Sequence, residues 1–275
     1  MNLSAYFERI AYDGPRVASR DALERIAYRH ALSIPFENLD AFLGIRISLD
    51  PEAVAEKLIT RRRGGWCFEQ NQLLGSALRE MGFVVKDLAA RVLWGQQADA
   101  VTPRTHRVLQ VRCDGRDWLV DAGFGGQSLT GVLDLQSDME QALPHELLRL
   151  RTSGADRVLE TRLWDQWRPM YRFDLQPQLA VDFEAANYWL SHDPASRFVT
   201  TLIAALPTPQ GRHALRDGLL TWYDAQGNAQ ESRLDSTAQV ATALREKFGI
   251  NLAGVQGLEQ RLAQMTTQAG TAARS

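Results

Sequence analysis

The spacing of apolar positions changes twice along the chain and divides it into three parts. Over residues 1–83 apolar residues recur every three or four positions, which is typical of amphipathic helices. Residues 84–195 contain short runs in which apolar and polar positions alternate, the period of a half-buried strand. Residues 196–275 combine strand-like runs with one helical stretch. The pattern therefore predicts an α+β fold with a helical part, a β-rich part and a smaller α/β part.

Local signals place the ends of several of these elements. Asp21, with a glutamate three residues later, has the spacing of a capping box and predicts the start of a helix. Asp50-Pro51 predicts the start of another, as an N-cap followed by a first-turn proline. In the last part, residues 198–203 and 219–223 read as strands. A helix is expected over residues 235–248, ended by the glycine that follows.

Cys67, one of only two cysteines, lies directly after a pair of glycines and at the head of a helical pattern that stops at Gly82. A thiol in the first turn of a helix lies near the positive end of the backbone dipole, which favours the thiolate form. The alternative is a buried free cysteine that packs as a small hydrophobe. On its own, this segment makes Cys67 a candidate nucleophile and no more.

A nucleophilic cysteine needs a base, and the base needs an orienting group. Asp114-Gly115 between two strand-like runs predicts a two-residue hairpin in which Cys113 faces Arg116. In that register Asp121 is a diagonal neighbour of His106 on the same face of the sheet. The argument requires a hairpin without a bulge, because a slip of one residue moves a side chain to the other face. Taken singly, His106 also reads as a solvated strand residue and Asp121 as a strand-end cap.

Length, charge and composition argue against a nucleic-acid-binding, membrane or secreted protein. A chain of 275 residues can bury a large core, and its net charge of −2 gives no electrostatic reason to expect a nucleic-acid partner. No apolar run approaches the ~20 residues that span a bilayer, and the N-terminus has no secretory signal pattern. The two cysteines lie in separate predicted elements, and Cys67 must be a free thiol to act as a nucleophile. Both observations suit a reducing compartment. We therefore expect a cytoplasmic enzyme with no membrane partner.

Four sequence blocks resemble the signature of the arylamine N-acetyltransferases. They are residues 34–39 (IPFENL), residues 63–71 (RGGWCFEQN), the Thr105-His106 strand start, and residues 120–126 (VDAGFGG). The block around the cysteine is highly specific, whereas a glycine-rich GFGG run alone is a weak signal. The blocks occur in the family's order, and the chain's length suits the bacterial members.

The resemblance implies a fold as well as a function. It implies a cysteine-protease-like core, made of an N-terminal helical bundle and an antiparallel β-barrel, with a smaller C-terminal α/β lid domain. On this interpretation residues 1–83 form the helical domain and carry the nucleophile. Residues 84–195 form the barrel and carry the base and its orienting group, and residues 196–275 form the lid.

The resemblance further implies a Cys-His-Asp triad at Cys67, His106 and Asp121. Acetyl-CoA is then the acyl donor and an aromatic amine or hydrazine the acceptor. No metal and no tightly bound cofactor are expected. In such a triad the imidazole takes the thiol proton and the carboxylate stabilises the imidazolium. The backbone N–H of Cys67 is the first candidate to stabilise negative charge on the carbonyl oxygen.

Further residues are assigned to the substrate sites. Three rings, those of Phe36, Phe124 and Phe68, are candidates to line an apolar slot for the aromatic acceptor, with core packing as the alternative.

Glu37 and Arg63 are expected to form a buried ion pair that holds the glycine turn before the cysteine.

The donor is expected to approach along a glycine-rich loop. Gly125 and Gly126 would let a pantetheine arm come close to the backbone. Thr102 and Pro103, just before the histidine, are candidates for CoA contacts by family position only.

Several functions share these residues. Thiol proteases, other thiol hydrolases and transglutaminases also use a Cys-His-Asp set, although they surround the cysteine differently. A non-catalytic protein that binds CoA thioesters is a further alternative, against which the intact triad argues. Amide synthases that close a macrolactam belong to the same family and require a roomier cleft.

Overall fold

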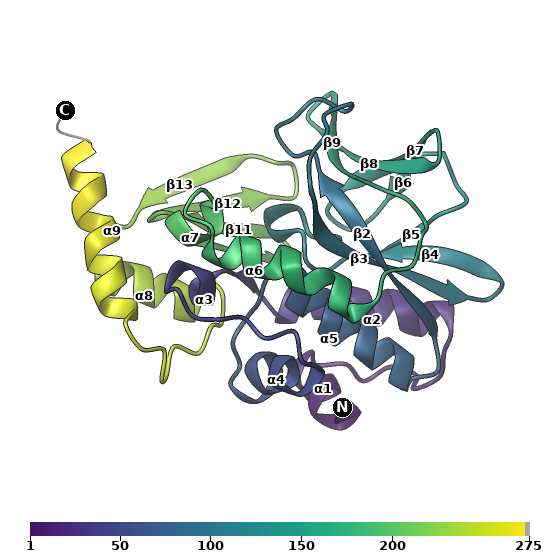
Figure 1. Ribbon diagram of the computed structural model, residues 1–275, viewed down its shortest axis with the longest axis horizontal. Helices are drawn as coiled ribbons and strands as arrows, with labels where there is room; N and C mark the ends of the chain where they lie inside the picture. The colour runs from purple at the N-terminus through teal and green to yellow at the C-terminus, as the bar shows by residue number, and fades with distance from the viewer. Residues whose placement is uncertain (273–275) are drawn as a thin grey trace.

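The N-terminal part of the chain is helical and lies beneath the larger of two β-sheets (Figure 1). The computed structural model describes residues 1–272, with side chains described through residue 266. The helices of this part are α1 (Leu3–Arg9), α2 (Arg20–Ser33), α3 (Leu39–Phe42), α4 (Pro51–Ala55), the π-helical turn η1 (Glu56–Thr60) and α5 (Cys67–Glu80).

One of the two predicted helix starts is correct and the other is displaced. Asp50 caps α4 as predicted, because its carboxylate accepts two first-turn backbone N–H groups at 2.9 and 3.0 Å. The predicted capping box at Asp21 is wrong, since α2 begins two residues earlier with Ser19 as N-cap. The Ser19 hydroxyl accepts the N–H of Ala22, and Asp21 lies in the first turn, where it forms an ion pair with Arg25.

The β-rich part is an eight-stranded antiparallel sheet in the order β5-β4-β3-β2-β9-β8-β7-β6. Its two edge strands approach each other where the Gln141 side chain makes hydrogen bonds of 2.8 and 3.1 Å with the backbone of Asp134. These bonds bring the sheet close to a closed barrel. The strands are β2 (Val84–Val92), β3 (Arg104–Cys113), β4 (Arg116–Val120), β5 (Val132–Asp134), β6 (Gln141–Ala142), β7 (Leu147–Ser153), β8 (Asp156–Leu163) and β9 (Gln166–Phe173).

The hairpin of β3 and β4 has the register that the sequence predicts. Cys113 pairs with Arg116, and the ladder continues without a bulge to Leu109 opposite Val120. Both turn residues, Asp114 and Gly115, have positive φ angles of 51° and 73°. A two-residue turn of this kind matches the twist of the strands it joins.

After the barrel, the chain supplies helices and four of the five strands of a second antiparallel sheet. The predicted strand over residues 198–203 is mostly wrong, because residues 197–200 form the short helix α7 and β10 begins only at Ile203. The helix expected over 235–248 is present as α8. The elements are α6 (Glu184–His192), α7 (Arg197–Thr200), β10 (Ile203–Thr208), β11 (Gly211–Arg216), β12 (Leu219–Asp224), β13 (Ala229–Arg233), α8 (Thr237–Glu246) and α9 (Leu258–Ala272).

The first strand of this second sheet comes from the N-terminal part. The order is β1-β10-β11-β12-β13, and β1 consists of Phe36 and Glu37. Phe36 pairs with Ala205 and Glu37 with Ala204, so that residues about 170 positions apart in the sequence are neighbours in the sheet. This pairing places the start of the cysteine-bearing segment against the C-terminal sheet.

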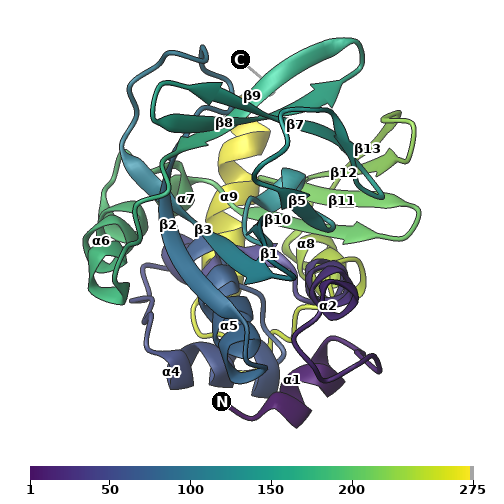
Figure 2. The same cartoon turned by 90° about the vertical axis from the view of Figure 1, so that its right-hand side faces the viewer.

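The arrangement confirms the predicted α+β class, with a helical part, a nearly closed barrel and a smaller α/β part packed beside them (Figure 2). The domain boundaries near residues 83 and 195 stay predictions. Among the described helices, none has the length and apolar character that crossing a membrane requires.

Candidate active site

Cys67 is the first residue of α5 and follows the extended residue Trp66. The turn before it requires glycine, because a Cβ on Gly64 would lie 2.2 Å from the Pro35 carbonyl oxygen. The carboxylate of Glu69 accepts the Trp66 N–H at 3.2 Å and so fixes the start of the helix. Cys67 is 8 % exposed, and its position places the thiol at the positive end of the α5 dipole.

His106 and Asp121 form a buried pair on the barrel side of the same site. The distance from His106 Nε2 to Asp121 Oδ2 is 2.7 Å, which leaves Nδ1 free to face Cys67. The Cys67 thiol lies 3.8 Å from the Thr105 carbonyl oxygen, next to the histidine in sequence. Burial alone would lower the pKa of His106, but the Asp121 carboxylate, with a further contribution from Cys67, raises it to about 10. The histidine is therefore poised to hold a proton as imidazolium.

Asn71 connects the cysteine helix to the aspartate, a role that the sequence analysis missed. Its Nδ2 donates to Asp121 Oδ1 at 2.9 Å and to the Arg107 carbonyl at 2.6 Å. Its Oδ1 accepts the Ala122 N–H at 3.1 Å. A residue four positions after Cys67 lies on the same helix face, and this spacing was the available signal. Asn71 thus fixes Asp121 relative to the helix that carries the thiol.

Gly123 allows the loop after β4 to come close to the helix. A Cβ at this position would lie 2.6 Å from the Cys67 Cα, so any larger residue would push the two segments apart. The Gly123 N–H donates to Asp121 Oδ1 at 2.9 Å. Burial raises the pKa of Asp121, but its bonds to His106, Asn71 and Gly123 outweigh this effect and the pKa is lowered. The carboxylate is held ionised against the histidine.

Aromatic rings enclose the histidine. The centroids of Phe124 and Tyr171 lie 5.2 and 5.1 Å from that of His106, and Trp94 stands edge-on to Phe124. Phe124 was predicted at the site. Tyr171 and Trp94 come from other strands and loops, and no sequence signal identified them. The rings remove water from around the imidazole and limit its orientation.

A cleft of about 800 Å³ opens onto Cys67 and His106. Asp121 is 1 % exposed and lies behind His106, where an orienting group belongs. Side chains from α6, α7 and the five-stranded sheet form the opposite side of the cleft, including Trp189 and Phe198. The predicted substrate and donor residues on its wall are Phe36, Phe124, Thr102, Pro103, Gly125 and Gly126.

Phe68 is not part of this wall, and its assignment to the acceptor slot is wrong. Its side chain is fully buried and packs against Trp66 and Phe183, with ring centroids 5.9 Å away in both cases. The residue after Cys67 points to the other side of α5, into the core. Phe198, on α7, lies 6.3 Å from Phe36 by ring centroids and occupies the cleft instead.

The predicted ion pair of Glu37 and Arg63 is present and belongs to a larger buried network. Arg63 Nε lies 2.7 Å from Glu37 Oε1, and its second nitrogen lies 2.9 Å from Asp40. Lys57 Nζ lies 2.7 Å from both Asp40 and Glu69. Glu69 also accepts the backbone N–H of Trp66. The network therefore supports both the glycine turn before Cys67 and the start of α5.

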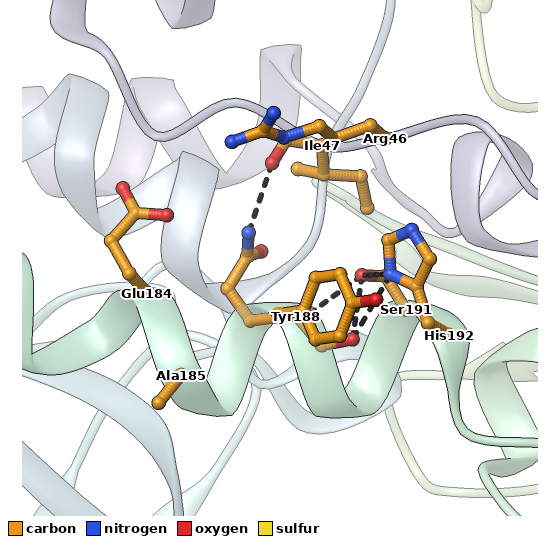
Figure 3. A pocket seen from close by; sticks show the side chains of 8 residues that line it. Arg46, Ile47, Glu184, Ala185, Tyr188, Ser191 and His192 are labelled. Carbon is orange, nitrogen blue, oxygen red and sulfur yellow. Dashed lines mark hydrogen bonds between the residues drawn. The ribbon is translucent and has the colours of Figure 1, made fainter.

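A smaller pocket of about 320 Å³ lies between α6 and the segment that contains Arg46 and Ile47 (Figure 3). In it Tyr188 and His192 stack with centroids 4.3 Å apart, and the Asn187 amide donates to the Ile47 carbonyl oxygen at 2.9 Å. None of the predicted site residues lies there. Within the described residues, no group of three or more His, Cys, Asp or Glu side chains is arranged to hold a metal ion.

Comparisons with known proteins agree on one family. A family model described as N-acetyltransferase matches residues 20–256. An arylamine N-acetyltransferase of Mycolicibacterium smegmatis is 41 % identical over 271 residues, which cover 96 % of this chain and 98 % of the relative. The structure of the M. tuberculosis arylamine N-acetyltransferase matches with a TM-score of 0.91 at 41 % identity, covering 95 % of this chain and 99 % of that one. The Mycobacterium marinum enzyme in complex with CoA matches with a TM-score of 0.92 at 36 % identity, covering 96 % and 99 %.

Proposed function

This chain belongs to the arylamine N-acetyltransferase family, and on that premise we propose that it transfers the acetyl group of acetyl-CoA to the nitrogen of an aromatic amine or hydrazine. The observation that carries the proposal is the meeting of Cys67, at a helix start, with the buried His106–Asp121 pair on the wall of one cleft. The choice of donor is supported by the M. marinum relative, whose structure holds CoA.

The first half-reaction loads the enzyme. His106 accepts the thiol proton, and the Cys67 thiolate attacks the thioester carbonyl carbon of acetyl-CoA. The C–S bond to CoA breaks, the CoA thiolate takes the proton back from the imidazolium, and an acetyl-cysteine remains. The N–H of Cys67 is one of the backbone groups that a helix start leaves unpaired, and it is the candidate donor to the developing oxyanion.

The second half-reaction transfers the acetyl group from the enzyme to the acceptor. A neutral aromatic amine attacks the acetyl carbonyl, and His106 removes the amine proton as general base, a role worth ~10²–10⁴ in rate. The bond to sulfur breaks, and the Cys67 thiolate and the imidazolium are restored as the starting pair. The rings of Phe36 and Phe124 provide an apolar surface on which an aromatic acceptor can pack, and this surface favours the acceptor over water.

The size of the cleft favours this function over the alternatives. A volume of about 800 Å³ lies within the range of roughly 300–1,000 Å³ of small-molecule sites. It suits a slender acyl donor and a small aromatic acceptor, whereas the macrolactam of an amide synthase needs more room. A thiol hydrolase would need ready access of water to the acyl-enzyme, which the aromatic rings around His106 oppose.

Loading tests the proposal directly. We expect acetyl-CoA alone to add one acetyl group to the intact protein, measured by mass spectrometry, and Cys67→Ala to abolish the addition. An arylhydrazine should then remove the acetyl group far faster than water does. Initial-rate plots at several acceptor concentrations should be parallel, as a ping-pong mechanism requires. Intersecting plots with no covalent species would instead indicate direct transfer and refute the acetyl-cysteine.

A further inference from the structure

One face of the five-stranded sheet forms the side of the cleft opposite the triad. Residues of β10, β11 and β12 line the cleft. On β11 they include the alternate positions Arg212, Ala214 and Arg216, and on β12 they are Leu219, Thr221 and Tyr223, as expected for one face of a sheet. The cleft therefore receives positively charged side chains from β11 at regular spacing.

The first of these arginines already has partners. Arg212 donates to the carbonyl oxygens of Gly126 and Ser128 at 3.0 and 3.2 Å, and it forms an ion pair with the buried Glu146. These contacts fasten the glycine loop to β11. Arg212 is thus used by the fold.

Two other arginines of the cleft have no such partners. The side chains of Arg216, at the end of β11, and Arg197, at the start of α7, make no hydrogen bond and no ion pair with any residue that the structure describes, and the Arg197 guanidinium lies 5.2 Å from the centroid of the Phe198 ring. Both line the cleft. Burial, followed by the charge of Arg216, lowers the pKa of Arg197. The carboxylate on this wall, Glu231, comes from the more distant strand β13.

The path between these arginines and the thiol is lined by apolar side chains, most of them small. Phe36 pairs with Ala205 across β1 and β10, and Ala205 pairs with Ala214 across β10 and β11. Arg216 lies two positions beyond Ala214, about 7 Å along the strand. Small side chains along this path leave room for an extended arm that ends at the arginines.

We propose that Arg197 and Arg216 bind the phosphate groups of the acyl donor and so direct its pantetheine arm along the sheet toward Cys67. The inference rests on the proposed use of acetyl-CoA. Arginine binds phosphate through paired, charge-assisted hydrogen bonds, and two uncompensated cations in a cleft favour a polyanion over a neutral ligand. The phosphates of CoA lie at the end remote from the thioester, and the arginines line the same cleft as Cys67. They act as donor-binding residues and take no part in the chemistry.

Donors that lack phosphate test the assignment. With acetyl-CoA and an arylhydrazine, Arg197→Gln and Arg216→Gln should each lower kcat/KM about tenfold, through KM for the donor. With S-acetylpantetheine, which has no phosphate, both variants should match the parent protein. Lysine at either position should restore part of the loss because the charge is retained. Arg245→Gln, an exposed arginine on α8, is the matched control and should have no effect.

Acetyl-dephospho-CoA identifies which phosphate is bound. If the arginines bind the 3′-phosphate, the parent protein should lose the same factor with this donor and the variants should lose nothing more. If they bind the diphosphate, the variants should keep their defect with it. Equal losses with acetyl-CoA and S-acetylpantetheine, or no loss with either, would overturn the proposal.

Equilibrium binding separates this inference from the proposed function. Titration calorimetry with CoA and with pantetheine requires no turnover. Weaker binding of CoA to the glutamine variants, with pantetheine binding unchanged, supports the arginine site even if the protein fails to transfer an acetyl group. Unchanged CoA binding refutes the site even if transfer is efficient.

Discussion

At the scale of single residues, the charge on His106 depends on one carboxylate. Asp121 raises the pKa of His106 to about 10 against the effect of burial, so the imidazolium persists through neutral pH and can stabilise a thiolate. We expect Asp121→Asn to slow alkylation of Cys67 by iodoacetamide at pH 6 by roughly 10²-fold, the factor expected if an ordinary thiol with a pKa of ~8.5 replaces the ion pair. Cys113 is the internal control, because burial and Asp114 raise its pKa to about 11 and it should label slowly in both proteins. Equal labelling of the two cysteines would contradict the triad.

At the scale of elements, α5 and the loop after β4 must keep a fixed relation, and Asn71 maintains it through three hydrogen bonds. Asn71→Ala leaves buried polar partners unsatisfied, which costs about 1–3 kcal/mol of the free energy of unfolding. We also expect the rate of acetyl loading to fall by at least about tenfold while KM for acetyl-CoA stays constant, since the change disturbs Asp121 and not the cleft wall. Gln72→Ala, at the next position of the helix, is the control and should leave loading unchanged. A loss of stability with normal loading would restrict Asn71 to a structural role.

At the scale of the whole molecule, a buried charge network connects β1, α3, η1 and the start of α5, the helix that carries Cys67. Lys57 Nζ forms ion pairs with both Asp40 and Glu69, and the pKa of Lys57 is raised above its ordinary value because nearby carboxylates outweigh its burial. Lys57→Met would leave two buried carboxylates short of a partner, and we expect it to lower the free energy of unfolding by about 3–5 kcal/mol in urea titrations. Lys86→Met, at an exposed position of β2, should change it by less than about 0.5 kcal/mol. The double change Lys57→Met with Glu69→Met should recover part of the loss, and a purely additive result would argue against the network.

The sequence by itself determined the features that rest on local physics. The three- and four-residue spacing after Cys67 predicted the helix that carries the thiol, and the structure begins α5 at that residue. The Asp114-Gly115 turn predicted the hairpin register, because a two-residue loop fixes which positions face each other. That register makes Asp121 a diagonal neighbour of His106, and in the structure their side chains lie 2.7 Å apart. The family blocks added the chemistry, and the comparisons support the same family.

Only the tertiary structure decided what depends on segments far apart in the chain. Whether a ring lies in the core or in the cleft follows from the packing of whole elements. The sequence therefore predicts a cleft position for Phe68 and a strand at Phe198, whereas the structure has Phe68 in the core and Phe198 on the helix α7 in the cleft wall. The pairing of β1 with β10, the place of Tyr171 against His106 and the presence of Arg197 and Arg216 in one cleft leave no trace in local periodicity. Periodicity reports which face of an element is buried, whereas the partner of that face is set by the compact arrangement with the lowest free energy.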